Sequence, residues 1–375
     1  MNFFYCNGSI SIIVANALIR EKFQGDKNIL IIEKDSTKVF PSKFLKYPDN
    51  YYSIIDVIKQ TSDWDKVYEV SVKTFFISIE DMKWPLSIFP LRNLRLILSR
   101  KKTLEYVNQM LPKLTQKDNF FVSDNSILWR YIYNKKCPLS YIEHGAASYR
   151  TGVIEKNWKY FLKAFLSLLR RVNLNLAPNK IYLSDNFQSN RFLSYENKKI
   201  GTRPISFNLR NSIHDIFEIF FQKYKEIHFD AYKELEHLIE EYRYKNIYIY
   251  LPTTIVPNSE YQQYLNSQML SIKSKENVFL IKAHGNDSLR DYNIYFRRLK
   301  LDSFCFKEDL NNFIPAEILL FFFNNAKIFG SYSSSHLYSR WWLNKETIFA
   351  EDPKSSVHEL LLKEYYATYD DMHKY

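Results

Sequence analysis

Short apolar runs that alternate with helix-length segments are the feature that most restricts what this chain can fold into. The runs lie at residues 3–6, 28–32, 67–70, 119–124 and 137–142, and then again at 244–252, 278–282, 326–330 and 347–349. Helical patterns lie between some of them, at 12–19, 314–323 and 339–343. Strands that alternate with helices indicate crossover connections, which join parallel strands. The sequence therefore predicts an α/β chain built on parallel sheets.

The strand–helix pattern starts again in the middle of the chain, and this restart defines the predicted domains. A chain of 375 residues is long for one compact domain. We predict an N-terminal doubly wound domain over residues 1–205 and a C-terminal doubly wound domain over residues 206–350. The two domains are expected to face each other across a deep cleft. A helical segment over residues 351–375 is expected to pack back on the N-terminal domain.

The formal net charge of +11 favours a polyanionic partner. A basic surface attracts nucleic acid, an acidic lipid leaflet or an acidic polysaccharide, although scattered positive charge can also serve solubility alone. Nucleic acid is disfavoured, because the sequence has no zinc finger, no RNA-recognition signature and no basic helix with a dimerisation heptad. An acidic glycan or an acidic membrane surface is the better match.

Cysteine usage and hydropathy indicate a soluble or peripheral protein of a reducing compartment. Cys6, Cys137 and Cys305 lie far apart without a CxxC pair, which argues against a disulfide framework or a structural zinc site. The N-terminus lacks the pattern of a signal peptide, and no apolar run reaches the roughly 18 residues that span a bilayer. The basic, aromatic segment 158–176 fits a packed helix better than a helix in an anionic membrane interface.

Chemically useful residues follow the apolar run 137–142. In doubly wound sheets, ligands bind outside the carboxyl ends of the strands. Glu143 at such a position can act as a general base towards an acceptor hydroxyl, or it can be a capping or ion-paired glutamate. His144 fits the same role or a supporting one, and the small Gly145 allows a ligand to approach closely.

A second group of residues follows the run 278–282. Lys282 ends this run, and His284 and Gly285 follow after Ala283. An imidazolium at His284 can donate to a phosphate oxygen and offset the charge on a departing nucleotide. A lone histidine is more often structural, but this one shares its strand end with polar neighbours.

A serine run forms the third group. Ser333, Ser334 and Ser335 are predicted to lie in the loop between a strand and the next helix, where hydroxyls and backbone N–H groups can hold an anion. Serines in such a place also act as ordinary helix caps. Glu317 opens the helix before that strand, where the helix dipole stabilises a carboxylate. The same carboxylate could bind the ribose or base of a nucleotide.

The sequence gives little support for a metal site. Asp63-Trp64-Asp65 matches the D-x-D pattern of metal-dependent nucleotide-sugar enzymes, but it lies in a polar turn and we favour a solvated turn. The sequence also has no H-E-x-x-H, GxSxG, P-loop or GxGxxG motif. Protease, esterase, ATPase and dehydrogenase functions are therefore unsupported.

The sites of bacterial sialyltransferases of the GT-B fold resemble four motifs of this chain in order and spacing, and the capsular polysialyltransferase family is the most similar. The four motifs are Glu143-His144-Gly145, His284, the helix start with Pro315 and Glu317, and Ser333 to Ser335. These families carry an acidic-acidic-glycine motif in the first domain, a histidine-proline motif in the second and a serine-rich loop near the nucleotide phosphate. The resemblance implies two Rossmann-like domains, with the acceptor on the first and the nucleotide sugar on the second.

The activity that the resemblance implies is an inverting, metal-independent transfer of sialic acid from CMP-sialic acid to the non-reducing end of a sialylated or polysialic acid acceptor, in capsule polysaccharide synthesis. Glu143 would be the base, and His284 would protonate or hydrogen-bond the CMP phosphate. The residues assigned to the nucleotide sugar are Lys282, Gly285, Glu317, Ser333, Ser334 and Ser335, and those assigned to the acceptor or its support are His144 and Gly145. No cofactor is implied, because a monophosphate leaving group does not require a metal.

Two positions depart from the family pattern. His144 stands where the second acid is expected, so Glu143 alone would act as base, and Gly285 stands where proline is expected. The implied partners are a CMP-sugar donor and a polyanionic oligosaccharide. The implied location is the cytoplasmic face of a bacterial inner membrane, in peripheral contact with anionic lipid and capsule assembly proteins.

Two other functions fit the same residues. One is another GT-B transferase that uses CMP-Kdo or transfers polyol phosphate from a CDP-polyol. The other is a non-catalytic protein that binds acidic glycans or membrane lipids through its basic surface.

Overall fold

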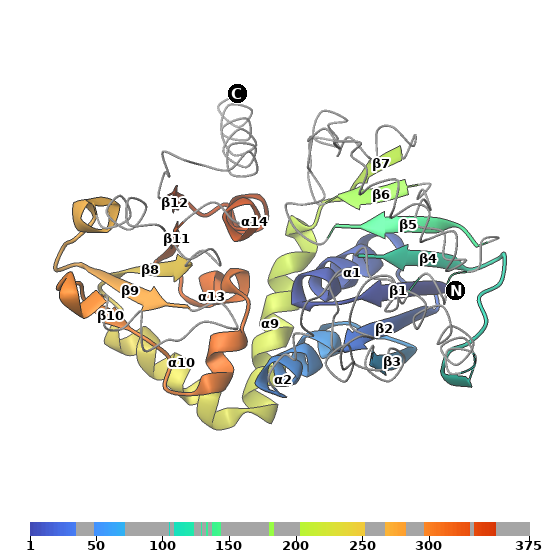
Figure 1. Cartoon of the computed structure of the whole chain (residues 1–375), viewed down its shortest axis with the longest axis horizontal. Coiled ribbons are helices and arrows are strands. Elements are labelled where there is room, and N and C mark those ends of the chain that lie inside the picture. Colours follow the sequence, from blue (N-terminus) through green and yellow to red (C-terminus); the bar gives the residue numbers. More distant parts are fainter. Residues whose placement is uncertain are drawn as a thin grey trace, which may run out of the picture. The chain divides into compact units, whose positions relative to one another are not determined.

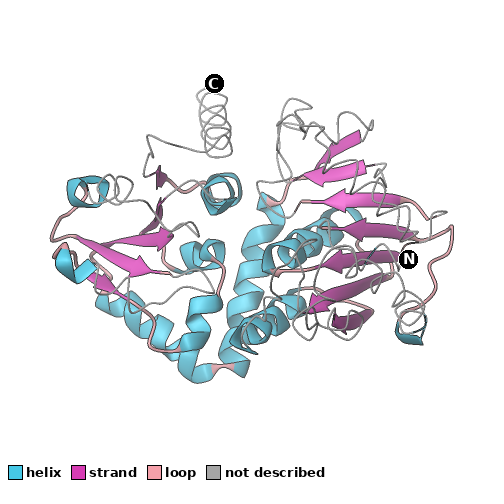
Figure 2. Ribbon diagram, viewed as in Figure 1, coloured by secondary structure: helices cyan, strands magenta, loops and turns pink. Residues whose placement is uncertain are grey.

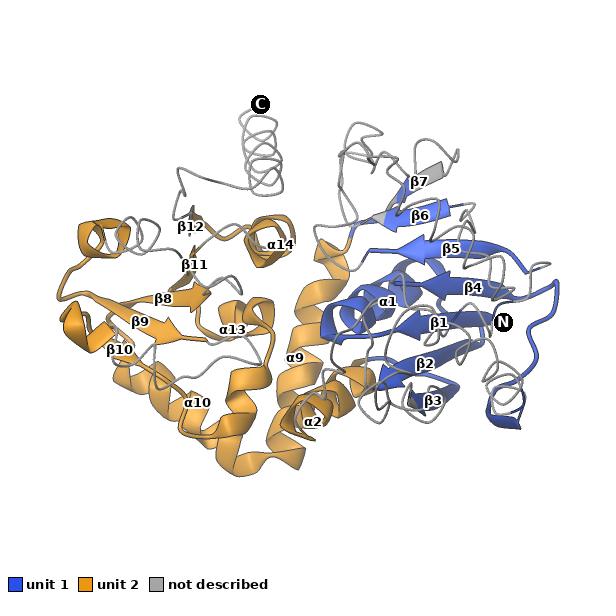
Figure 3. Ribbon diagram, viewed as in Figure 1, with its two compact units in different colours: residues 1–47, 62–208 blue, residues 48–61, 209–375 orange. Residues whose placement is uncertain are grey.

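The chain forms two compact α/β units in the computed structural model, each built on one parallel β-sheet (Figure 1). The first unit comprises residues 1–47 and 62–208, and the second comprises residues 48–61 and 209–375 (Figure 3). The structure describes residues 1–34, 49–71, 105, 109–123, 129, 133, 137–143, 180–183, 203–251, 267–282, 296–330 and 334–349.

The sheet of the first unit has seven strands in the order β3-β2-β1-β4-β5-β6-β7 (Figure 1), and all neighbours are parallel. Figure 2 draws the strands in magenta. The chain leaves β1 towards β2 and β3 and then returns to the other side of β1 for β4, which is the order of a doubly wound sheet. The elements are β1 (Asn2–Cys6), α1 (Ser9–Lys22), β2 (Asn28–Lys34), β3 (Lys66–Ser71), β4 (Asn119–Val122), β5 (Leu139–Ile142), β6 (Lys180–Leu183) and β7 (Arg203–Ser206).

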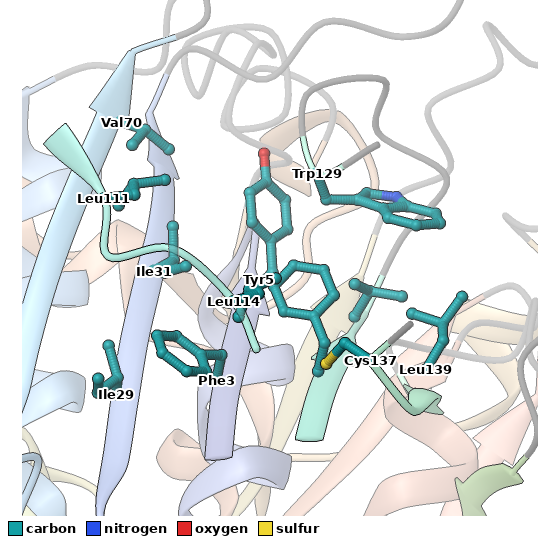
Figure 4. Packing of buried hydrophobic residues seen from close by; sticks show 12 residues of the cluster. Phe3, Tyr5, Ile29, Ile31, Val70, Leu111, Leu114, Trp129, Cys137 and Leu139 are labelled. Atoms are coloured by element: carbon teal, nitrogen blue, oxygen red, sulfur yellow. The ribbon is translucent and has the colours of Figure 1, made fainter. Parts of the chain in front are cut away.

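Both faces of this sheet are buried at its centre. Phe3 and Tyr5 of β1 pack on one face in a cluster that includes Trp129 (Figure 4). Phe4, between them, lies on the other face, and its ring stacks on that of Phe121 with 4.6 Å between the centroids. Parallel strands that are covered on both faces are continuously apolar, which is why the run 3–6 is a strong signal for a strand.

Asparagines join the amino ends of three neighbouring strands in the first unit. Asn2 donates its amide to Asn28 Oδ1 at 3.0 Å, and Asn119 donates its amide to Asn2 Oδ1 at 2.9 Å. The Asn28 amide also donates to the Asp26 carbonyl, and its backbone N–H donates to the Asp65 carboxylate at 2.7 Å. We refer to Asn2, Asn28 and Asn119 as the asparagine ladder, which ties β2, β1 and β4 together at one edge of the sheet.

Replacement of Asn28 by alanine is expected to lower the free energy of unfolding by about 2–3 kcal/mol, because buried polar groups of the ladder lose their partner. Asn246→Ala is the matched control. Asn246 makes the same kind of bond to Asn277 Oδ1, at 2.9 Å, but is exposed, so its loss is expected to be below about 1 kcal/mol. Urea unfolding measures both variants, and equal losses would contradict the role of the ladder.

The second unit repeats this strand order on a smaller scale. Its five parallel strands follow the order β10-β9-β8-β11-β12, which corresponds to β3-β2-β1-β4-β5 of the first unit. The strands are β8 (Asn246–Leu251), β9 (Asn277–Ile281), β10 (Ser303–Phe304), β11 (Ala326–Gly330) and β12 (Thr347–Phe349). The helices are α9 (Arg210–Ile227), α10 (Phe229–Glu241), α13 (Ala316–Phe322) and α14 (Ser334–Leu343), with a 3₁₀ helix η4 (Asp309–Phe313).

One piece of the second unit comes from the N-terminal part of the chain. Helix α2 (Asp49–Ile58) and the 3₁₀ helix η1 (Lys59–Thr61) connect β2 to β3 of the first unit, yet they cluster with the second. α2 packs on η4 and α9, and η1 packs on α9. The buried residues of α2 are Ile54, Ile55, Val57 and Ile58. The domain boundaries expected from the sequence did not include this excursion.

The α/β class and the parallel sheets expected from the sequence are confirmed, and each predicted strand corresponds to an observed one. The loop predicted for Ser334 and Ser335 is wrong, because α14 begins at Ser334. Leu337 and Trp341 recur at helical spacing and are buried, so packing extends this helix towards the N-terminus. The predicted segment 351–375 lies outside the described residues.

All three cysteines are free thiols. Within the described part of the chain, no helix combines the length and the apolar character needed to cross a membrane. The basic, aromatic segment 158–176 lies outside that part.

Candidate functional site

The switch point of the second sheet lies between β8 and β11, where the order of the strands reverses. Ligands of doubly wound sheets bind at the carboxyl ends of the strands beside such a point. The two backbones approach closely there, because a Cβ on Gly330, the last residue of β11, would lie 2.4 Å from the carbonyl oxygen of Leu251. Gly330 has a φ of +150°, a backbone conformation that residues other than glycine rarely adopt.

Lys282 directly follows β9, the strand beside β8. Its backbone N–H extends the sheet by donating to the Tyr250 carbonyl at 3.2 Å, and its ammonium donates to the Asn312 carbonyl at 2.8 Å. Burial lowers the pKa of Lys282 to about 8, and the nearby Glu317 carboxylate opposes this shift. The side chain therefore still carries a positive charge near neutral pH.

Glu317 lies in the first turn of α13, directly after Pro315 and Ala316, and is buried. Burial raises the pKa of this carboxyl, whereas its own backbone N–H, the Ser335 hydroxyl and the Lys282 ammonium lower it. Lys282, Glu317 and Ser335 are far apart in the sequence, and the structure brings them together at the carboxyl edge of the second sheet. We call these three residues the donor cluster, after the ammonium and hydroxyl hydrogen-bond donors that surround the Glu317 carboxylate.

Asn312 was not singled out from the sequence. It lies on η4, and both polar atoms of its side chain are buried. Among the described residues, neither atom has a hydrogen-bond partner, which is uncommon for a buried amide. The residues around it on η4 match no known motif, so the sequence gives no reason to select this position.

The other predicted residues of the second unit are only partly covered by the structure. Ser334 and Ser335 begin α14, so their backbone N–H groups belong to the first turn of a ten-residue helix. His284, Gly285 and Ser333 lie outside the described residues.

Glu143 is the predicted site residue of the first unit that the structure describes. Its backbone N–H donates to the Tyr182 carbonyl at 3.1 Å, which continues the pairing of β5 with β6. Its side chain is fully buried. His144 and Gly145 lie outside the described residues.

A second buried carboxylate lies at the same edge of the first sheet. Glu33, near the carboxyl end of β2, is buried and accepts a hydrogen bond from the Tyr5 hydroxyl. Its position directly after an apolar run is visible in the sequence, but the run alone gives it no chemical role. Glu33, on β2, and Glu143, directly after β5, lie to either side of the switch point between β1 and β4.

The Asp63-Trp64-Asp65 segment forms the turn before β3. The side chains of Asp63 and Asp65 are exposed, and Asp65 binds the backbone of Asn28 through its carboxylate and its N–H. This agrees with the solvated turn favoured from the sequence. Among the described residues, no group of three or more His, Cys, Asp and Glu side chains is arranged to hold a metal ion.

No family model and no curated protein sequence matches this chain. Solved structures do match its fold. A crystal structure of UDP-GlcNAc 2-epimerase from Neisseria meningitidis bound to UDP-GlcNAc is similar, with a TM-score of 0.53 and 10% identity, over 100% of this chain and 92% of that one. Arabidopsis thaliana UGT89C1 complexed with quercetin matches with a TM-score of 0.43 and 10% identity, over 98% of this chain and 89% of that one. The similarity to the epimerase structure, together with the two parallel sheets, shows an α/β fold of the GT-B type with two Rossmann-like domains.

Proposed function

We propose that this protein is a nucleotide-sugar-dependent glycosyltransferase, and more specifically an inverting sialyltransferase that uses CMP-sialic acid and extends a polysialic acid acceptor. The observation that carries the proposal is the donor cluster of Lys282, Glu317 and Ser335 at the carboxyl edge of the second sheet. The resemblance of the strand-end motifs to those of sialyltransferases supports the choice of donor.

Each member of the donor cluster suits one part of a bound nucleotide. The Lys282 ammonium complements a phosphate, and the hydroxyl of Ser335 and the first turn of α14 can add neutral donors. The Glu317 carboxylate can accept hydrogen bonds from ribose hydroxyls. We assign His284 to the phosphate of the leaving group, where it would donate a proton or a hydrogen bond as CMP departs.

The acceptor hydroxyl needs a base, and we assign that role to Glu143. The carboxylate would take the proton of the hydroxyl as its oxygen attacks the anomeric carbon and the bond to the CMP phosphate breaks. Glu143 is fully buried, so this role requires the acceptor to reach the end of β5 and exclude water there. A base that the acceptor reaches and water does not cannot activate water, so the CMP-sialic acid donor is protected from unproductive hydrolysis.

The net charge of +11 supports a polyanionic acceptor. Lysine and arginine side chains can hold a chain of carboxylates by contacts that salt screens. Oligosialic acid is therefore expected to be retained at low salt and released near physiological salt. The same charge would favour peripheral contact with anionic lipid at the cytoplasmic membrane face.

The direct test is incubation with a panel of CMP-, CDP- and UDP-sugars and a labelled sialylated acceptor. Transfer from CMP-sialic acid alone would support the proposal. Preference for CMP-Kdo or a CDP-polyol would reassign the donor, and turnover of UDP-GlcNAc would contradict a sialyltransferase. Retention of acidic glycan without any turnover or nucleotide binding would indicate a non-catalytic binding protein.

Glu143→Gln and His284→Ala are each expected to slow CMP-sialic acid turnover by about 10²–10⁴-fold, the usual contribution of a general acid or base. Glu346→Gln is the matched control, because Glu346 is an exposed carboxylate that pairs with Lys327 at 2.6 Å. Turnover is measured as CMP release, with circular dichroism to check folding. Full activity of both site variants would rule out the assigned roles.

A further inference from the structure

One buried asparagine holds η4 to helices α9 and α10. The side chain of Asn311 is fully buried, and its Oδ1 accepts the Tyr224 hydroxyl at 2.7 Å. Its Nδ2 donates to the Ala231 carbonyl at 2.9 Å and to Glu234 Oε2 at 2.8 Å. The carboxamide is thus bonded through both of its polar atoms, as expected of a buried polar group that fixes a structure.

Glu234 extends this network to the backbone before η4. Its carboxylate accepts the backbone N–H groups of Lys307 at 2.6 Å and Glu308 at 3.0 Å. The N–H of Asn311 in turn donates to the Glu308 carbonyl at 3.0 Å. We call Tyr224, Glu234 and Asn311 the η4 clamp, because together they hold the start of η4 on α9 and α10.

The η4 clamp is linked to the donor cluster through Asn312, the residue that follows Asn311 in the sequence. The carbonyl of Asn312 accepts the Lys282 ammonium at 2.8 Å. This bond uses one of the three N–H groups of the ammonium and so restricts where the other two point. An ammonium held in place binds a phosphate with a smaller loss of side-chain entropy than a freely rotating one.

We propose that Asn311 is a positioning residue for the nucleotide phosphate, since it fixes η4 and thereby the Asn312 carbonyl that orients the Lys282 ammonium. This inference rests on the proposed function, because it concerns the same donor site. Asn311 itself contacts Tyr224, Ala231 and Glu234 rather than the donor cluster. Its effect on a nucleotide would therefore be indirect.

The test measures the binding of CMP to the full chain by calorimetry between about pH 7 and pH 10. The CMP phosphate, with a second pKa of about 6, is about 90% or more in its doubly charged form over this range. Wild-type affinity is expected to fall as pH rises through the pKa of Lys282, about 8, because the protonated ammonium attracts the phosphate and the neutral amine does not. Glu317 is the other charged group among the described residues that acts on this ammonium.

Asn311→Ala is expected to weaken CMP binding about tenfold near neutral pH, the smaller end of the losses seen when outer partners of a binding group are removed. The fall in affinity should also begin at a lower pH than in the wild type, because an ammonium that loses a carbonyl acceptor has a lower pKa. A change in the pH profile separates positioning from a general loss of stability. Tyr224→Phe removes one hydrogen bond of the clamp. It should lower the CMP affinity and the pH at which affinity falls in the same direction as Asn311→Ala, but to a smaller extent.

Asn277→Ala is the matched control. Asn277 also bonds a backbone carbonyl, that of Ile272 at 2.6 Å, but it lies at the amino end of β9, at the opposite edge of the same sheet. Its replacement is expected to lower thermal stability without changing CMP affinity or its pH profile.

The possible results separate this inference from the proposed function. If Asn311→Ala and Tyr224→Phe bind CMP like the wild type while Lys282→Met does not, the positioning role is wrong and the proposed site stands. If the wild type does not bind CMP, or if Lys282→Met binds it equally well, the proposed site fails and the positioning role fails with it.

Discussion

Replacement of Gly330 by alanine is expected to destabilise the second unit by roughly 3 kcal/mol or more. A Cβ at this position would lie 2.4 Å from the carbonyl oxygen of Leu251, and the φ of +150° would add strain. A backbone oxygen has less freedom to move than the end of a flexible side chain, so β8 and β11 would have to separate at the switch point. Urea unfolding followed by circular dichroism measures the loss.

Gly25→Ala separates the two causes of this effect. Gly25 has a φ of +85°, but no heavy atom lies within 4 Å of a Cβ placed there. Only the backbone strain applies, and the expected loss is about 1 kcal/mol. A loss at Gly330 no larger than that at Gly25 would mean that β8 and β11 tolerate separation. The Gly330 variant should also bind CMP more weakly if it folds, because β11 leads directly into the serine run.

The second large effect is expected at Lys282. Lys282→Met keeps the length of the side chain and removes its charge, so CMP binding should weaken by about 10- to 100-fold, the range for a charge-assisted hydrogen bond. Stability is expected to fall by about 1–2 kcal/mol, because the Asn312 carbonyl and the buried Glu317 carboxylate lose a partner, while the variant also removes a charge that burial disfavours. Calorimetry with CMP and thermal unfolding without ligand give the two quantities.

Lys345 provides a matched control for this variant. Burial lowers the pKa of its ammonium to about 8 as well, and the ammonium also donates to backbone carbonyls, those of Leu320, Phe323 and Asn324. These carbonyls lie at the end of α13, so Lys345→Met should lower stability by about 1–2 kcal/mol. CMP affinity should be unchanged. If Lys345→Met weakened CMP binding more than Lys282→Met, the donor cluster would be assigned to the wrong lysine.

The sheets were predictable because their strands are covered on both faces. Phe3 to Cys6 are all buried, and such strands appear in a sequence as uninterrupted apolar runs. Three strands were not predicted. β6 (Lys180–Leu183) was missed although Ile181, Tyr182 and Leu183 form a short apolar run, and β7 and β10 were missed for the opposite reason. β7 (Arg203–Ser206) begins with arginine and proline, and β10 (Ser303–Phe304) has only two residues, so neither forms an apolar run.

The candidate site was predictable only where chemistry coincides with a strand end or a helix start. Lys282 and Ser335 follow strands, and Glu317 starts a helix, so topology alone suggested that they could meet. Their contact depends on the order of the strands in the sheet, which cannot be read from the sequence. Asn311 and Asn312 belong to a 3₁₀ helix without hydrophobic periodicity. Asn311 bonds to α10 and Asn312 to Lys282, and no local sequence pattern predicts either hydrogen bond.

The placement of α2 has a consequence for how the protein is assembled during synthesis. α2 leaves the ribosome about 150 residues before α9, the helix on which it packs. Its buried isoleucines and valine therefore stay exposed to solvent until α9 has been synthesised. Contacts between segments so far apart in the sequence slow folding. A polypeptide cut after residue 208 would keep α2 but lose α9 and η4, on which α2 packs. The two units are thus expected to reach their native state only when they are produced as one chain.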